Sequence, residues 1–238
     1  MTTELMIYGD IGDTYWSEGI SQNDVLRGLK ELDQSADQHD IRINSPGGDV
    51  ATGITIMNLL RSHKEQMRAF NPNFKLLTVV DGYAKSVASV IMMAGDIRRV
   101  ALGGIVMIHD AWCYAYGNAK ELSAAAGRME ILSDNAATIY SSVVNQKEKN
   151  KDYFRQKMLE ETYFIGEEAV SSGLATESEQ VTAQLFADLT VDKLKGHYNE
   201  VMAKSAKNRT YNRPLSAVAL SNRQEAAKRL ALLSATIS

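Results

Sequence analysis

Cysteine is nearly absent from this sequence: Cys113 is the only one, so no disulfide can form within the chain. Long hydrophobic runs are absent too. The longest apolar stretch, residues 87–95, is far shorter than the roughly 18 residues of a membrane-spanning helix. The first residues lack the basic and apolar segments of a secretory signal. The net charge of −3 gives no electrostatic reason to expect nucleic acid as a partner. We therefore expect a cytoplasmic protein with neither membrane nor nucleic-acid partners.

The chain is long enough for one core domain of about 150–200 residues and an extension. Hydrophobic residues make up 45% of the sequence and charged residues 23%, which is ordinary for a globular protein with a sizeable core. We expect neither a metal nor any other cofactor.

Strand and helix patterns alternate along most of the chain. Strands are predicted over residues 4–8, 41–43, 76–80, 98–101 and 105–108. Helices are predicted to begin at Ser21 and to cover residues 50–63, 87–94, 118–149 and 151–159, with turns at 44–48 and 81–85. This alternation indicates an α/β domain with a largely parallel sheet.

Candidate reactive groups follow successive strands, where open α/β sheets usually bind ligands. Ser86 stands at the N-terminus of a buried helix, His109 ends an apolar strand, and Gly47-Gly48 forms a turn with accessible backbone amides. A serine that attacks an amide needs a base for its proton and N–H donors for the oxyanion. Each feature also has an ordinary explanation: a helix N-cap, a structural histidine and a simple turn.

Other nearby or titratable residues are less promising. His39, His63 and His197 lie in polar or charged sequence, and we expect them at the surface. Lys85 is adjacent to Ser86, so its side chain should point elsewhere, and we do not expect it to act as the base.

Four motifs, in this order, resemble the signatures of the Clp protease proteolytic subunit (ClpP) family. They are Asn44–Gly48 (NSPGG), Gly82–Ser89 (GYAKSVAS) with Ala94-Gly95, Met107–His109 (MIH) and Glu167–Leu174 (EEAVSSGL). The resemblance spans about residues 4–177. In character it is nearest to the ClpP-like capsid maturation proteases of phages and prophages.

The resemblance implies a ClpP/crotonase-like fold, a repeated β-α-β spiral with a long handle helix over residues 118–149. It implies a serine endopeptidase with Ser86 as nucleophile and His109 as general base. The backbone N–H groups of Gly48 and Val87 would form the oxyanion hole. It also implies a homo-oligomeric ring, either a heptamer or a double ring, that cleaves peptides and proteins inside an internal chamber.

The third catalytic residue departs from the family pattern. The family has an aspartate eight residues before the alanine of its last motif, and the matching residue here is Glu161. Glutamate orients the histidine in some hydrolases, so Glu161 is the expected third member. A solvated charge at a helix end explains Glu161 equally well, and Thr162 and Asp110 are the alternatives.

The predicted domains are residues 1–177, the protease domain, and residues 178–238, a helical extension that the housekeeping subunit lacks. The extension is basic. The cations of residues 181–238 are Lys193, Lys195, Lys204, Lys207, Arg209, Arg213, Arg223, Lys228 and Arg229, against the acids Asp188, Asp192, Glu200 and Glu225. Such asymmetry indicates an interaction segment or a merely solvated helix. The expected partners are a capsid or scaffold protein, or an ATPase.

Two other functions remain open from sequence. The substituted acid at Glu161 and the long extension fit a catalytically inactive ClpP-like assembly or scaffold protein. A crotonase-type acyl-CoA enzyme shares a related fold and a glycine-lined oxyanion hole, but it does not need Ser86 and His109 together.

Overall fold

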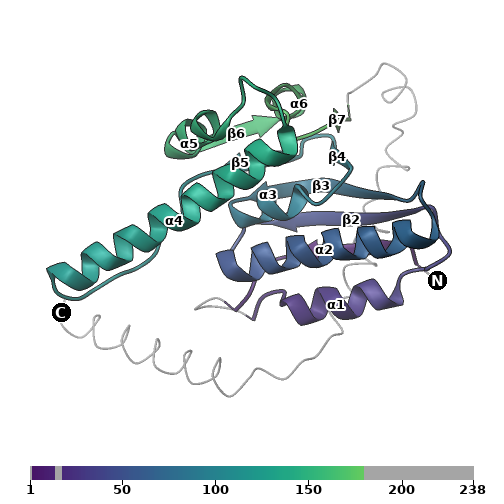
Figure 1. The fold of residues 1–238 in the computed structure, drawn as a ribbon, viewed down its shortest axis with the longest axis horizontal. Helices are drawn as coiled ribbons and strands as arrows, with labels where there is room; N and C mark the ends of the chain where they lie inside the picture. The colour runs from purple at the N-terminus through teal and green to yellow at the C-terminus, as the bar shows by residue number, and fades with distance from the viewer. Residues whose placement is uncertain (1, 14–17, 180–238) are drawn as a thin grey trace, which may run out of the picture. The chain divides into compact units, whose positions relative to one another are not determined.

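The computed structural model describes residues 2–13 and 18–179 of the chain. Within these residues a seven-stranded sheet runs in the order β1-β2-β3-β4-β7, and β5 pairs with both β3 and β6 (Figure 1). The strands are β1 (Glu4–Tyr8), β2 (Gln38–Ser45), β3 (Lys75–Lys85), β4 (Ile97–Val100), β5 (Ile105–Ile108), β6 (Thr162–Ile165) and β7 (Glu177–Ser178). All neighbours are parallel except β5 and β6, so the predicted α/β class is confirmed.

The helices of the described residues differ in how they meet the sheet. They are α1 (Gln22–Glu31), α2 (Val50–Phe70), α3 (Val87–Met92), α4 (Ala119–Val144), α5 (Lys151–Leu159) and α6 (Glu167–Ser172). Helices α1 and α2 lie side by side along one face of the sheet, whereas α4 runs outward from the body (Figure 1). None of these helices is long and apolar enough to cross a membrane.

Local sequence signals account for the helix boundaries. Ser21 caps α1 through a capping box with Asp24, and the Asp49 side chain accepts a hydrogen bond from the Thr52 N–H at the start of α2. All six residues of α3 are buried, as its uniformly apolar sequence predicted. Asn118 caps α4 in the same way as Ser21 caps α1.

The predicted turn at residues 81–85 is wrong, because these residues continue β3. Up to Val80 the strand pairs with β4, and beyond it Tyr83–Lys85 pair with β5. The change of neighbour keeps the backbone hydrogen-bonded, so the chain stays extended to Lys85. Strands β6 and β7 and helix α6 were not predicted.

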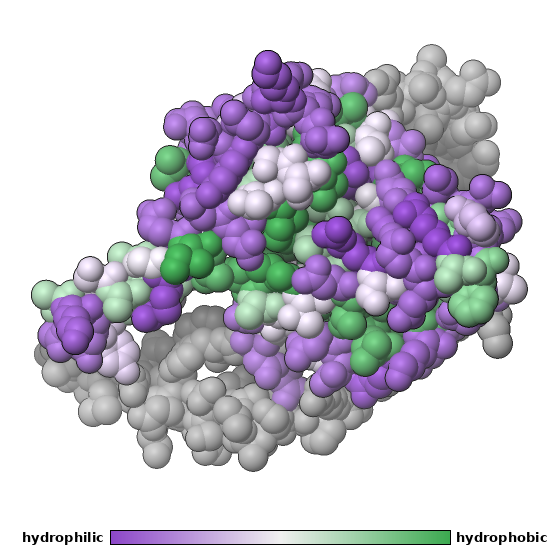
Figure 2. Space-filling model, viewed as in Figure 1, coloured by the Kyte–Doolittle hydropathy of each residue, from purple (hydrophilic) through white to green (hydrophobic). Residues whose placement is uncertain are grey.

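Hydrophobic side chains are exposed where α4 leaves the body, on a face that is otherwise mostly hydrophilic (Figure 2). Along α4 itself, Leu122 near its N-terminal end and Ile131 at its middle expose 42% and 68% of their surface. The far half of α4, residues 119–131, is exposed apart from Ala125 and the partly buried Met129.

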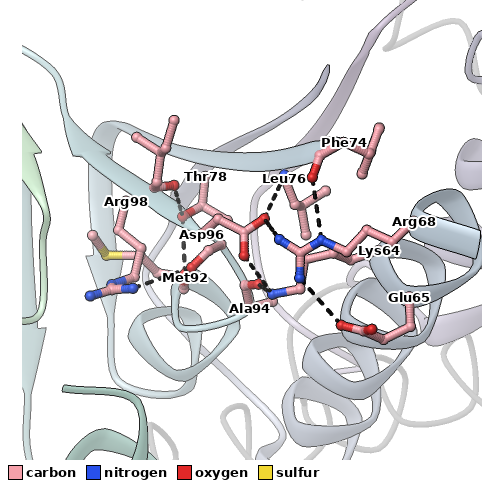
Figure 3. Close-up of polar contacts among 12 residues, drawn as sticks. Lys64, Glu65, Arg68, Phe74, Leu76, Thr78, Met92, Ala94, Asp96 and Arg98 are labelled. Atoms are coloured by element: carbon pink, nitrogen blue, oxygen red, sulfur yellow. Dashed lines mark hydrogen bonds and ion pairs between the residues drawn. The ribbon is translucent and has the colours of Figure 1, made fainter. Parts of the chain in front are cut away.

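Asp96, in the turn after α3, joins three elements (Figure 3). Its carboxylate accepts a hydrogen bond from the Leu76 N–H at 3.0 Å and pairs with Lys64 at 3.2 Å and Arg68 at 2.8 Å, both on α2. The Lys64 ammonium also donates to the carbonyl of Ala94 at 2.9 Å. These bonds, which we call the Asp96 clamp, fix the C-terminal end of α3 against α2 and β3.

Arg98, two residues after Asp96, ties the end of the described chain to the turn after α3. Its buried guanidinium donates to the carbonyl oxygens of Gly95, Gly173 and Leu174 at 2.8–3.2 Å. A buried cation is tolerated here because carbonyl oxygens replace its water shell. Ser178 in β7 and the Glu179 N–H, which donates to the Val100 carbonyl, also join the core. Residues 180–238, most of the predicted extension, lie outside the described residues.

His39 and His63 are buried, so their predicted surface positions are wrong; His197 lies outside the described residues. His39 on β2 and His63 on α2 expose 0% and 7% of their surface. Since a carbonyl only accepts, Nε2 of His39 donates to the Asp33 carbonyl at 2.8 Å, and Nδ1 of His39 accepts from Nε2 of His63 at 2.9 Å. Both rings pack edge-on against Phe74. Because the two imidazoles hydrogen-bond to each other and His39 bonds to the Asp33 carbonyl, both histidines can be buried despite their polar sequence neighbours.

We expect His63 to make the fold acid-sensitive. Burial, and secondarily the charge of His39, lower its pKa from 6.5 to about 4, so protonation favours the unfolded chain. The His63 contribution is complete above pH 6.5 and is lost as the pH falls towards 4, amounting to about 3 kcal/mol. Urea unfolding between pH 7.5 and 4.5, at one protein concentration, measures it. His63→Gln should flatten this pH dependence; an unchanged slope would contradict the assignment.

Candidate active site

Ser86 occupies a strained turn between β3 and α3. Its backbone angles, φ 54° and ψ −131°, are rare for a residue with a side chain. Gly166, between β6 and α6, adopts nearly the same conformation, which glycine reaches without cost. The Ser86 N–H donates to the Met107 carbonyl at 2.9 Å, which continues the β3–β5 pairing and holds the turn.

The Ser86 hydroxyl faces His109. Its Oγ lies 2.8 Å from Nε2 of His109, within hydrogen-bond distance, and it caps no N–H of α3. Ser86 occupies the N-cap position of α3, but because its hydroxyl makes no capping hydrogen bond, capping does not explain why a serine stands there. Because β3 and β5 are parallel neighbours, the residues that follow them emerge at the same edge of the sheet.

His109 is held in its neutral form at neutral pH. Partial burial lowers its pKa below the ordinary value of 6.5, while the charges of Glu161 and Asp110 act in the opposite direction. A neutral imidazole whose Nε2 accepts the hydroxyl proton is the form that a general base requires.

The glycine turn after β2 lies against Ser86. A Cβ on Gly47 would approach Ser86 Cβ to 2.7 Å, and one on Gly48 would approach the Ile11 carbonyl oxygen to 2.1 Å. Side chains are thus excluded at both positions. The flanking N–H and C=O groups bond to Ile11, whereas the exposed Gly48 N–H has no acceptor among the described residues. The Gly48 amide therefore remains available as a donor.

The second predicted oxyanion donor is the N–H of Val87. Val87 is the first residue of α3, where N–H groups have no partner within the helix and the helix dipole favours negative charge. A carbonyl oxygen placed beside Ser86 would meet a donor set of backbone groups, which needs no reorganisation when charge develops.

None of the candidates for the third catalytic residue hydrogen-bonds to His109 within the described residues. The Glu161 carboxylate accepts from the Tyr163 hydroxyl at 3.0 Å, and the Thr162 hydroxyl donates to the Lys157 carbonyl at 2.7 Å. The carboxylate of Asp110 pairs with Arg155. Glu161 lies in an exposed turn with φ 47°, and it acts on His109 through its charge alone.

Helix α4 supports the site from behind. The buried Tyr140 hydroxyl lies 2.8 Å from Ser89 Oγ, and Ser89 in turn donates to the Ser86 carbonyl. The Ser133 hydroxyl accepts from the Ala111 N–H at 2.9 Å. Neither α4 residue belongs to a recognisable motif, so sequence reasoning missed both.

Lys85 does not compete with His109. Its ammonium lies 4.2 Å from the centre of the Tyr83 ring, in a cation–π contact. A small apolar cleft beside Ser86 and His109 is lined by Val50, Val87, Val90, Leu132, Ala136 and Met158, among others.

A serine hydroxyl on a strained turn, a neutral histidine at its oxygen and backbone donors beside it are the groups that a serine hydrolase requires. The family model for Clp protease matches residues 6–181. The chain belongs to the Clp protease family and is a serine-type endopeptidase. The expected ClpP/crotonase-like fold is thereby confirmed.

Relatives named "ATP-dependent Clp protease proteolytic subunit" support this membership. The protein from Deinococcus radiodurans is 32% identical over 160 residues, which are 64% of this chain and 71% of that protein. The protein from Pleurastrum terricola is 30% identical over 68% of this chain and 80% of its own length. The protein from Ligilactobacillus salivarius is 28% identical over 71% and 79%, respectively.

We expect Glu161→Gln to shift the pH dependence of Ser86 reactivity. The Glu161 charge raises the pKa of His109, so its removal should move the acid limb of the rate to lower pH. A fluorophosphonate that labels Ser86, followed by intact mass across pH 4.5–8, measures this limb. Glu160→Gln is the matched control, because Glu160 is exposed and pairs with Lys157 at 2.8 Å. An acid limb that stays in place in Glu161→Gln would exclude an electrostatic role.

Proposed function

We propose that this chain is a ring-forming serine endopeptidase in which Ser86 is the nucleophile and His109 the general base. The 2.8 Å contact between Ser86 Oγ and His109 Nε2 carries the proposal. Nε2 takes the hydroxyl proton as Oγ bonds to the carbonyl carbon of the substrate. The N–H groups of Gly48 and Val87 stabilise the oxyanion, and the protonated imidazole then gives its proton to the leaving amine. Water, deprotonated by His109, hydrolyses the acyl-enzyme.

Glu161 is proposed as the orienting residue for the imidazolium. Its charge favours the protonated form of His109, the form that develops in the transition state. In the structure the Glu161 carboxylate accepts a hydrogen bond from the Tyr163 hydroxyl at 3.0 Å, so its proposed action on His109 is through charge. Glu161 is the proposed third member because its charge is the largest carboxylate contribution to the His109 pKa.

Loss of either central residue should abolish proteolysis. We expect Ser86→Ala and His109→Ala each to lower peptide hydrolysis by at least about a thousandfold, since the two groups act as a unit. Casein and a fluorogenic peptide, with circular dichroism as the folding check, provide the measurement. Wild-type hydrolysis that survives in either variant would exclude the mechanism. Inactivity of the wild type, with no labelling at Ser86, would favour the assembly-protein alternative.

A ring assembly is supported by the exposed half of α4. A capped helix that leaves the body with exposed apolar side chains gains stability when another subunit covers them. Figure 1 shows this helix extending beyond the sheet, and Figure 2 shows hydrophobic surface at its base. We infer that several copies pack through α4 and that the sites open into the enclosed space.

Light scattering at micromolar concentration should show a multi-subunit species. We expect the double substitution Leu122→Glu and Ile131→Glu to shift this species towards smaller masses, because charged side chains at a covered apolar surface are desolvated without partners. Phe70→Glu on α2, where Phe70 is 88% exposed, is the matched control. A monomeric wild-type chain would contradict ring assembly.

The proposed biological setting is capsid maturation. The basic composition of the extension supports a role in bringing the protease to an assembling capsid or scaffold protein. The relatives named as ATP-dependent subunits favour an ATPase as the alternative partner. The contact between Ser86 and His109 argues against an acyl-CoA enzyme, which does not require that pair.

A further inference from the structure

Arg155 on α5 binds carboxylates from two other parts of the chain. Its guanidinium pairs with Asp110, which directly follows His109, and with Glu130 and Asp134 of α4, at 2.9 Å and 3.1 Å. The Arg155 side chain is only 15% exposed, so these contacts are partly shielded from water. A planar guanidinium presents several donors at fixed angles and can hold such a set at once.

The Asp110 carboxylate depends on Arg155 for compensation. Within residues 2–13 and 18–179, Arg155 is the only cation that pairs with Asp110. The neighbouring cation Lys151, one turn earlier on α5, pairs with Asp134 at 2.7 Å instead. Removal of Arg155 would leave the Asp110 charge without a partner, one residue from His109.

We propose that Arg155 is a positioning residue for His109: it anchors Asp110 to α4 and α5 and so fixes the backbone from which the imidazole projects. This proposal rests on His109 as the general base. The Ala111 N–H, bonded to Ser133 Oγ at 2.9 Å, secures the other side of Asp110 to α4. Besides the contact of His109 with Ser86, residues 109–111 are thus held to α4 and α5 by one ionic and one neutral contact, and the ionic contact is the stronger.

The same contact also neutralises one of the two carboxylates whose charges act on His109. Glu161, from the turn before β6, and Asp110 both favour the imidazolium. The charged groups around Asp110 are Arg155, Lys151, Glu130 and Asp134. Arg155 opposes the field of Asp110 at His109, so its loss should stabilise the imidazolium and leave less of the neutral base at a given pH.

The rate at which a fluorophosphonate labels Ser86, followed by intact mass from pH 4.5 to 8.5 on the full chain, tests the proposal. In Arg155→Met we expect the acid limb to rise by about 0.5 to 1 pH unit. The plateau rate should fall about tenfold, because the imidazole is less well placed. Arg155→Lys keeps the positive charge but loses the planar guanidinium with its several donors. It should therefore retain the wild-type acid limb with a lowered plateau rate.

A double substitution separates the positioning of His109 through Asp110 from a general loss of stability. Asp110→Asn should lower both the acid limb and the plateau rate. Arg155→Met added to Asp110→Asn should not lower the plateau further, because the guanidinium then has no Asp110 charge to anchor. Lys151→Met, which loses a contact to Asp134 but none to Asp110, is the matched control with a wild-type limb. If Arg155→Met fails to fold by circular dichroism, Arg155→Lys and Asp110→Asn still decide the question.

The outcomes distinguish this inference from the proposed function. A wild-type chain that is not labelled at Ser86 would overturn both. A labelled wild type whose acid limb and plateau are unchanged in Arg155→Met would overturn the positioning role alone. An equal limb shift in Lys151→Met would assign the effect to net charge and would also overturn it.

Discussion

The site depends on a change of partner halfway along β3. The strand pairs with β4 up to Val80 and with β5 from Tyr83, and only the second pairing places the end of β3 beside the end of β5. The Ser86 N–H adds one more bond of the same ladder. Backbone hydrogen bonding, which is not specific to side chains, therefore sets the distance between the serine and the histidine. The Asp96 clamp secures the opposite end of α3 and so limits movement of the serine.

Ser86 and His109 are held in place by different kinds of contact. Ser86 is constrained by buried backbone and by Ser89 and Tyr140 beneath it. His109 lies at the start of a segment whose fixed points are polar contacts to α4 and α5. The position of Ser86 should therefore tolerate changes in nearby charge. The position and the pKa of His109 should respond to such changes.

Much of the sheet and the central pair could be predicted, because apolar periodicity and motif order depend on local sequence. The bounds of β1, β5 and α5 match those expected. Residues 81–85 were mistaken for a turn because a change of strand partner leaves no local signal. The burial of His39 and His63 depends on a bond between distant elements. The position of Glu161 was taken from a family pattern, but its hydrogen bond is to Tyr163, and the contacts of Arg155 join separate helices.

The backbone conformation of Ser86 places selection for catalysis in conflict with selection for folding stability. A serine with φ 54° costs about 1–3 kcal/mol relative to a residue that tolerates that angle, and Gly166 shows glycine in the equivalent place. Selection for folding alone would therefore replace Ser86 by glycine in copies of the gene that no longer need to cut peptides. Among descendants of this chain, a glycine at position 86 would record the loss of catalysis together with a gain in stability.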